Sequence, residues 1–466
     1  MSVSSEKEID ATIEQFRMLV DWARRVRAED IPREVLKHAA LVIADDVAVA
    51  ISTQDEPEVS RFQNLMLDGS GAAEATVIRA GAPRADRYSA AVANTLATAT
   101  AELACLFLPG PCHAGLFTVP VLCAEAEAGN LSGIEVLRAE VLAYEITARL
   151  SLAWKGAQDR YGTVYTHGRL SSLGAAAATA LARVIDTEVF LQSLWNAATL
   201  SNVTPQNNAL RGATVRDTWP AAGAWSGMMS VRWAQCGFSG LPSSLYDVFS
   251  GVLGYVAVPA ALGSALGADW AVLQTSHRTH ACPLVNNAVI EALLELRPRI
   301  REASLDDIEQ IRVEVPADKC DLVNPAPATT LAARFSFPHV VATTLFHGHA
   351  SAAAFSSATL ELPAIDRLRH KVAVAPFDMS NAVKGYRYPA AVSITMRGGA
   401  VHSARCTKPL GVDGVQHPSE TILRKIEDLS AAHHPRFGRA ARELVALDPR
   451  HLDAPWSRFM REALGA

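Results

Sequence analysis

Apolar residues recur at helical spacing through the first half of the chain, as in amphipathic helices packed on a core. Near the end of a second predicted helix the apolar positions become almost continuous, which indicates that this end is buried. Gly129 and Asn130 would stop one helix, and Pro220 would open another, capped by Asp217 or Thr218. The helices predicted from this pattern cover residues 5–26, 32–52, 84–106, 117–128, 132–153, 171–184, 187–200 and 220–236.

The pattern changes from about residue 278 onward. Residues 308–315, 370–375 and 391–396 alternate between apolar and polar, which predicts half-buried strands. The turn at Arg397-Gly398-Gly399 predicts a hairpin whose second strand is 401–407. Helices are expected over 335–345 and again from about residue 418.

These elements predict a mainly α fold with an inserted α+β domain. The large all-helical domain would cover residues 1–270 and be completed by 412–466, and the smaller α+β lid domain would cover 271–411. The cleft between two such domains is a usual place for a small-molecule site.

Composition excludes several classes of protein. The chain has 466 residues, 49% of them hydrophobic and 20% charged, with a formal net charge of −5 and no basic run, so we expect no nucleic-acid partner. The uncharged stretches 103–124 and 248–268 are interrupted by proline or glycine, so we expect no membrane span. An odd count of 7 cysteines without CxxC, and a polar N-terminus unlike a signal peptide, indicate reduced thiols and a cytoplasmic location.

Familiar cofactor and catalytic motifs are absent from the sequence: GxGxxG after a strand, GxxxxGK[ST], GxSxG and HExxH are not found. His347 and His349 form an HxH pair without a third ligand nearby, so a turn at the end of a helix is the better interpretation than a metal site. We therefore expect no metal site.

One stretch, 161–184, stands out for its chemistry. Tyr165, His167 and Arg169 lie in a polar segment, and an alanine-rich helix capped by Ser171 or Ser172 is expected to follow. The N-terminus of a helix favours an anionic ligand. The structural alternative is a solvated loop leading into a core helix.

Other titratable groups are spread along the chain. Arginine offers a fixed fork for carboxylates, whereas histidine and tyrosine can move a proton. Arginine almost never releases its proton, so it can anchor and stabilise charge but not act as the base. Taken singly, each of these residues is more often structural than catalytic. Outside the 161–184 stretch the candidates are His113, Arg216, Arg278, His280 and His339.

The order of several segments resembles the MmgE/PrpD family, whose members include 2-methylcitrate dehydratases, cis-aconitate decarboxylases and iminodisuccinate epimerases. The segments are IPREVLKHAALVIADDVAVAI, DRYSAAVANTLATATAEL, CHAG followed by VPVL and AEAEAG, LGAAAATA, AAGAWSGMMSVRWAQCGFSG, ARFSFPHVVATTLFHG and KPLGVDGVQHPS. The resemblance covers nearly the whole chain and implies a helical domain with an inserted α+β lid, an active site between them, no cofactor and a homodimer. The reactions it implies remove a proton next to a carboxylate, or release carbon dioxide, in small di- and tricarboxylic acids.

The family's acidic and histidine motifs correspond unevenly to this chain. His113 falls on the histidine after the acidic loop, and Glu102 is the surviving first acid of an E-L-D-D motif whose aspartates are here Ala104 and Cys105. Tyr165 stands where the G-F-H-x-T motif has histidine, and His167 stands at its threonine. The resemblance thus implies proton transfer by His113 with Tyr165 or His167, and Glu102 next to the substrate in a drier pocket.

The family's cationic positions keep their charge but change residue type. Arg216 and Arg278 fall on two lysines, and His339 falls on the aromatic residue of the F-S-x-x-Y motif. Arginine cannot take over a lysine base, so the resemblance implies that Arg216 and Arg278, with His280 beside them, bind the substrate carboxylate. His339 would be a catalytic partner on the lid.

The first hypothesis is a cofactor-independent lyase of the dehydratase or decarboxylase type that acts on a small anionic carboxylic acid. An epimerase or isomerase of a related di- or tricarboxylic acid is the alternative among enzymes. A relative that binds a ligand without catalysis is the alternative outside them, supported by the changed lysines and missing aspartates.

Overall fold

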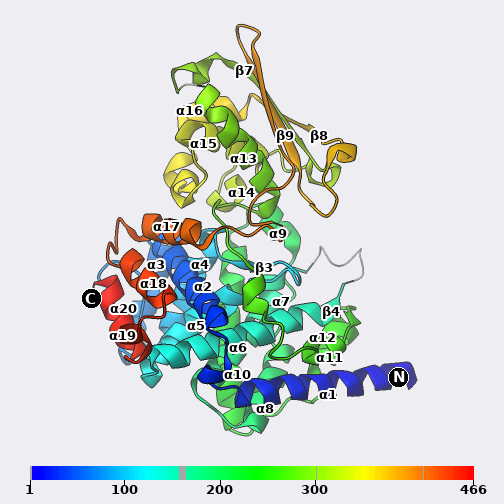
Figure 1. Ribbon diagram of the computed structural model, residues 1–466, viewed down its shortest axis with the longest axis vertical. Helices are drawn as coiled ribbons and strands as arrows, with labels where there is room; N and C mark the ends of the chain where they lie inside the picture. Colours follow the sequence, from blue (N-terminus) through cyan, green and yellow to red (C-terminus); the bar gives the residue numbers. More distant parts are fainter. Residues whose placement is uncertain (1–2, 157–163, 301, 413, 466) are drawn as a thin grey trace.

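The computed structural model describes residues 3–156, 164–300, 302–412 and 414–465. It consists of a large helical body with a smaller α+β lid above it (Figure 1). The predicted mainly α class is confirmed. Tyr161 and Gly162, at the start of the stretch singled out above, lie outside the described residues.

The body is built from the N-terminal helices and the last four helices of the chain. In Figure 1 the C-terminal helices lie against the N-terminal helices, and α17 (Ser419–Ser430) faces the lid. The other helices of the body are α1 (Val3–Arg25), α2 (Arg33–Ile51), α3 (Pro57–Asp68), α4 (Arg87–Thr100), α5 (Ala114–Gly129), α6 (Gly133–Leu152), α7 (Thr166–Ala182), α8 (Thr187–Thr199), α9 (Gln206–Leu210), α10 (Val215–Gln235), α11 (Ser244–Tyr246), α12 (Ala260–Gly263), α18 (Phe437–Val445), α19 (Pro449–Leu452) and α20 (Trp456–Leu464). Three two-stranded pairs join β1 (Ala75–Thr76) to β2 (Arg84–Ala85), β3 (Leu106–Phe107) to β6 (Thr275–Ser276), and β4 (Trp154–Lys155) to β5 (Val256–Ala257).

The lid is a four-stranded sheet with helices packed on one face (Figure 1). The strand order is β10-β9-β7-β8, in which β7 pairs parallel with β8 and antiparallel with β9, and β9 and β10 form the predicted hairpin. The strands are β7 (Ile308–Val315), β8 (Val372–Pro376), β9 (Ala390–Met396) and β10 (Val401–Cys406), and the helices are α13 (Asn287–Leu296), α14 (Thr330–Arg334), α15 (Phe337–His347) and α16 (Pro363–Arg369).

The buried apolar residues divide between the body and the lid. One cluster joins residues from Phe16 to Val272 with those from Ile422 to Leu464, and a second lies within the lid from Val285 to Ile394. A third cluster packs Val49 and Leu103 of the body against lid residues. The domain boundaries predicted above stay a prediction, but the two large clusters follow the same division of the chain.

Close packing of α7 against α10 explains the small residues in these two helices. A side chain at Gly223 of α10 would meet Ser171 Oγ at 1.9 Å, and one at Gly227 would meet the Ser172 carbonyl at 2.3 Å. Helices that lack side chains at the contact can approach closely, so α7 and α10 lie side by side. This contact brings the first turns of the two helices, with His167 and Arg216, to the same end of the body.

Several predicted helix bounds differ from the structure. The helix predicted over 84–106 is shorter, because Asp86 caps α4 and the chain leaves it at Thr100. Helix α7 begins at Thr166 rather than near Ser171, and α10 begins at Val215 with Pro220 inside it. Buried packing along both helices extends them past the polar residues that we expected to cap them.

A buried ion cluster ties the C-terminal helices to the start of the lid. Asp45 on α2 forms an ion pair with Lys425 Nζ on α17 at 2.6 Å and a hydrogen bond with His277 Nδ1 at 2.7 Å. Nearby, burial and the Asp45 charge raise the pKa of Asp46 to about 7. The helices in the described part of the chain are all too short or too polar to cross a membrane.

Candidate active site

The site is organised around Glu102, which follows the last turn of α4. Its backbone has φ +54°, a left-handed conformation that is uncommon for a residue with a side chain and often marks a functional position. The carboxylate is buried, with 4% of the residue exposed. Such a carboxylate needs cationic partners, and the strained backbone directs it toward them.

Arg216 and Arg278 converge on this one carboxylate. Arg278 Nη2 lies 3.1 Å from Glu102 Oε2, and Arg216 Nη2 forms an ion pair with Glu102 Oε1. Arg278 also donates to the Cys282 carbonyl at 2.6 Å. The two guanidinium groups that the sequence analysis proposed as a pair are therefore neighbours, although they come from α10 and from the start of the lid.

Arg216 is held from several sides. Its Nη1 donates to the Ala99 carbonyl at 3.0 Å and to Asp217 Oδ1 at 2.9 Å, and its Nη2 donates to the Tyr165 hydroxyl at 3.4 Å. Burial lowers the pKa of Arg216 and raises the pKa of Asp217, but an arginine keeps its proton. Arg216 is thus fixed as a cation behind the cavity and does not line it.

Arg334 is a buried cation that the sequence analysis missed. It lies at the end of α14 in the lid and donates to the Thr100 carbonyl at 3.1 Å. Arg216 and Arg334 therefore bind the last two carbonyls of α4, the negative end of that helix. The interaction joins the lid to the body beside Glu102.

His113 precedes the first turn of α5 and faces the cavity. Its Nδ1 lies 3.0 Å from the Cys105 carbonyl oxygen, and because a carbonyl only accepts, Nδ1 carries the proton and donates. Burial and the charge of Arg278 lower the pKa of His113 to about 3. The ring is therefore neutral near pH 7, and Nε2 is the nitrogen that carries the lone pair.

The ring of His167 stacks on this histidine, and the ring of Tyr165 lies against His167. The ring of His167 lies 4.9 Å from His113, with an angle of 19° between the planes, and 4.7 Å from Tyr165. His167 is fully buried, neither ring nitrogen has a partner among the described residues, and burial holds its pKa well below the usual value. Burial raises the pKa of Tyr165 to about 12. His113 and Tyr165 line the cavity, whereas His167 supports them from behind.

The cavity has a volume of about 280 Å³ and lies between the body and the lid. Among the described residues that line it are four basic side chains, Arg169, Arg278, Lys319 and Arg387, and one carboxyl group, Glu102. Lys319 also pairs with Asp318 at 2.7 Å. A concave site with more basic than acidic side chains attracts small anions.

Arg169 also lines the cavity, although the sequence analysis gave it no role. It lies in the first turn of α7 with 5% of its surface exposed, and its guanidinium stacks over the Tyr255 ring at 4.7 Å. Its Nε has no hydrogen-bond partner in the described part of the chain. The observed start of α7 at Thr166 places this arginine at the helix N-terminus, where an anion is favoured.

Two predicted residues lie away from the cavity lining. His339 is fully buried inside the lid, with its ring 6.0 Å from Phe355 and both nitrogens unpartnered among the described residues. His280 lies toward His417, and burial lowers its pKa to about 4. The site roles proposed for both residues stay predictions.

The described part of the chain holds no group of three or more His, Cys, Asp or Glu side chains arranged to bind a metal ion. The rings of His347 and His349 lie 5.7 Å apart near the end of α15.

Comparison with protein-family models assigns the class. The MmgE/PrpD N-terminal domain matches residues 17–260, and the MmgE/PrpD C-terminal domain matches residues 280–448. The chain belongs to the MmgE/PrpD family, as the order of its motifs predicted.

Two individual relatives extend this comparison. Cis-aconitate decarboxylase of Aspergillus terreus is 22% identical over 435 residues, which cover 88% of this chain and 88% of the relative. A protein of the same name from Aspergillus terreus strain NIH 2624 / FGSC A1156 is 23% identical over 439 residues, again 88% of each chain.

Proposed function

We propose that this protein is a cofactor-independent lyase, of the dehydratase or decarboxylase type, that acts on a small carboxylic acid. Membership of the MmgE/PrpD family and the likeness to cis-aconitate decarboxylases support this general class. The main structural support is that Arg278, Glu102 and a neutral His113 line the same cavity, whose other charged side chains are basic.

The arginines would bind and the rings would move protons. Arg278 and Arg169 line the cavity and would hold substrate carboxylate groups, and Arg216 would keep Glu102 in place. His113 Nε2 would accept the proton from the carbon next to a carboxylate, while Arg278 stabilises the negative charge that develops. Tyr165 keeps its proton, because its pKa is about 12, and would donate it to the leaving hydroxyl group or to the carbon that loses carbon dioxide.

Substrate binding would make His113 a better base. Burial and the positive charge of Arg278 hold its pKa at about 3 in the free protein. A carboxylate bound to Arg278 offsets that charge and adds a negative charge beside the ring, so the pKa of His113 rises on binding. A base works best when its pKa is near the working pH, and this coupling would reserve the active base for the bound state.

The His113→Asn variant tests the role of the base. Asparagine can still donate to the Cys105 carbonyl through its amide but has no basic nitrogen, so turnover is expected to fall about 100-fold while carboxylate binding is kept. The measurement is loss of water or carbon dioxide from a panel of di- and tricarboxylic acids, followed by NMR. Unchanged turnover in this variant would exclude His113 as the base.

The Arg278→Gln variant tests the anchor. Loss of a charge-assisted hydrogen bond is expected to weaken binding of the best carboxylate about tenfold, measured by isothermal titration. Arg397→Gln is the matched control, because the Arg397 side chain is 72% exposed and lies at the lid hairpin. Equal affinity in wild type and Arg278→Gln would contradict the proposed anchor.

The same panel separates the alternatives. An epimerase would exchange the substrate proton with deuterated solvent without loss of water or carbon dioxide. Two titratable rings, His113 and Tyr165, line the cavity, and this observation supports the epimerase alternative. A non-catalytic relative would bind a carboxylate and be stabilised by it without any turnover.

A further inference from the structure

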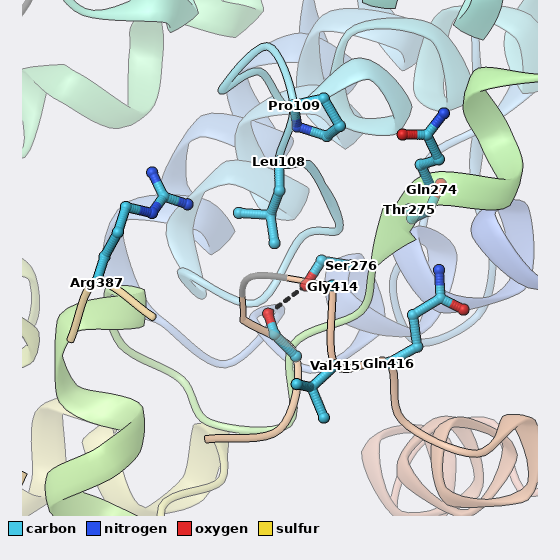
Figure 2. A pocket seen from close by; sticks show the side chains of 10 residues that line it. Leu108, Pro109, Gln274, Thr275, Ser276, Arg387, Gly414, Val415 and Gln416 are labelled. Atoms are coloured by element: carbon cyan, nitrogen blue, oxygen red, sulfur yellow. Dashed lines mark hydrogen bonds between the residues drawn. The ribbon is translucent and has the colours of Figure 1, made fainter. Parts of the chain in front are cut away.

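A second pocket adjoins the active cavity. Its volume is about 440 Å³, and it shares the side chains of Leu108 and Arg387 with the cavity. Figure 2 shows the Leu108 side chain directed toward Ser276, with Arg387 on one side of the pocket and Gln274 and Gln416 on the other. Leu108 and Arg387 therefore lie at the boundary between the two spaces.

The surface of the second pocket is mostly apolar. Leu108, Pro109 and Val415 contribute to it, and Arg387 is the one charged residue among the described residues that line it. Two of its polar groups are already bonded to backbone: Ser276 Oγ donates to the Gly411 carbonyl, drawn as a dashed line in Figure 2, and Gln416 Nε2 donates to the Leu273 carbonyl at 2.8 Å. Loss of hydration there would cost a second carboxylate free energy, whereas an apolar chain gains free energy by leaving water.

The walls of this pocket are held by backbone pairing. Leu106 and Phe107 pair with Ser276 and Thr275, which fixes the segment that carries Leu108. On the other side the Gly411 N–H donates to the Val415 carbonyl at 2.6 Å. Gly411 has φ +72°, and a side chain there would meet the His277 carbonyl at 3.0 Å, so the turn depends on glycine. The pocket is thus preformed, as ligand sites usually are.

We infer that the substrate carries a linear apolar substituent that occupies this second pocket while its carboxylates are held in the basic cavity. This inference rests on the proposed function, because it takes the carboxylate end to lie at Arg278. The ligand class is a di- or tricarboxylic acid with an unbranched hydrocarbon arm. The contrast between a cavity lined by four basic side chains and an adjoining apolar pocket carries the inference.

Alkyl-substituted succinates of increasing chain length test it, with succinate itself as the reference. Isothermal titration is expected to show that affinity rises about fourfold for each added methylene group until the chain fills the pocket. Val415→Trp fills the pocket from a residue that does not line the cavity, so it should remove this gain and leave succinate affinity unchanged. Gln274→Trp, at an exposed lining residue, is a second variant with the same expectation if Val415→Trp fails to fold.

The matched control is Val256→Trp on β5, because Val256 is 59% exposed and lines neither pocket; this variant should keep the full chain-length dependence. Succinate binding without a gain from added methylenes, or a gain that survives both filling variants, overturns the inference and leaves the proposed function standing. Succinate binding equally to wild type and Arg278→Gln would instead refute the proposed function, and the inference with it.

Discussion

The Glu102→Gln variant is expected to lose about 3 to 5 kcal/mol of unfolding free energy. Glu102 is the shared carboxylate of two buried arginines, and glutamine keeps its shape while removing its charge. Arg216 would retain Asp217, at 2.9 Å, but among the described residues Arg278 would keep only neutral hydrogen-bond partners. Buried cations that lose their counter-charge destabilise the folded state far more than exposed ones.

Urea denaturation followed by tryptophan fluorescence measures this loss. Glu295→Gln is the matched control, because Glu295 pairs with Arg299 at 3.1 Å with both side chains more than half exposed, and such pairs contribute less than about 1 kcal/mol. A loss in Glu102→Gln as small as that of the control would mean that the arginines are not held by this carboxylate.

A second readout distinguishes this charge effect from simple misfolding. With Glu102 neutral, the guanidinium groups have unmet positive charge, so added citrate should raise the melting temperature of Glu102→Gln more than that of wild type. A misfolded variant would show no such recovery. The test therefore reports on the electrostatics of the site as well as on its stability.

Local pattern was enough to predict most of the fold. The alternation in 308–315 predicted β7 with its observed bounds, because a half-buried strand shows its two faces directly in the sequence. Helix starts were predicted less well: Pro220 was assigned to a first turn, yet it lies inside α10. That start depends on packing against α7, which no local signal reports.

The sequence brought forward candidate residues that lie close together, but it could not give their pairs. Residue types and family motifs brought His113, Tyr165, Arg216 and Arg278 forward, and all of them lie in or against one cavity. Glu102 and Arg278 are 176 positions apart, so their ion pair exists only in three dimensions. Arg334 was missed for the same reason, since its partner is the end of α4, 234 positions away in the chain.

Acidification is expected to destabilise the protein steeply between about pH 6.5 and pH 5, because several buried histidines are neutral. Burial lowers the pKa of His113 to about 3, of His339 to about 3, and of His167 well below its usual value. In the unfolded chain each would titrate near about 6.5. The unfolded state therefore binds more protons than the folded state below that pH, so stability is fully present above it and falls as the pH falls.

The size of the effect follows from the shifts. At about pH 5 His113 and His339 can each remove about 2 kcal/mol, which together is a large share of the stability of a typical domain, and His167 acts in the same direction. His339 is the best one to change, because it lies in the lid away from the cavity lining and its nitrogens have no partner among the described residues. Phenylalanine would keep the ring that packs against Phe355 and remove the titrating group.

Unfolding free energies measured at several pH values should show a slope that is shallower in His339→Phe by about 1.4 kcal/mol per pH unit, the contribution of one proton. At neutral pH the variant should be at least as stable as wild type, since no hydrogen bond is lost in replacing an unpartnered imidazole with an apolar ring. His370→Phe is the control, because the His370 side chain is 59% exposed and meets water in both states. An unchanged slope in His339→Phe would contradict this account. It would show that His339 is protonated in the folded protein at the same pH as in the unfolded chain, which requires water or a hydrogen-bond acceptor beside the ring.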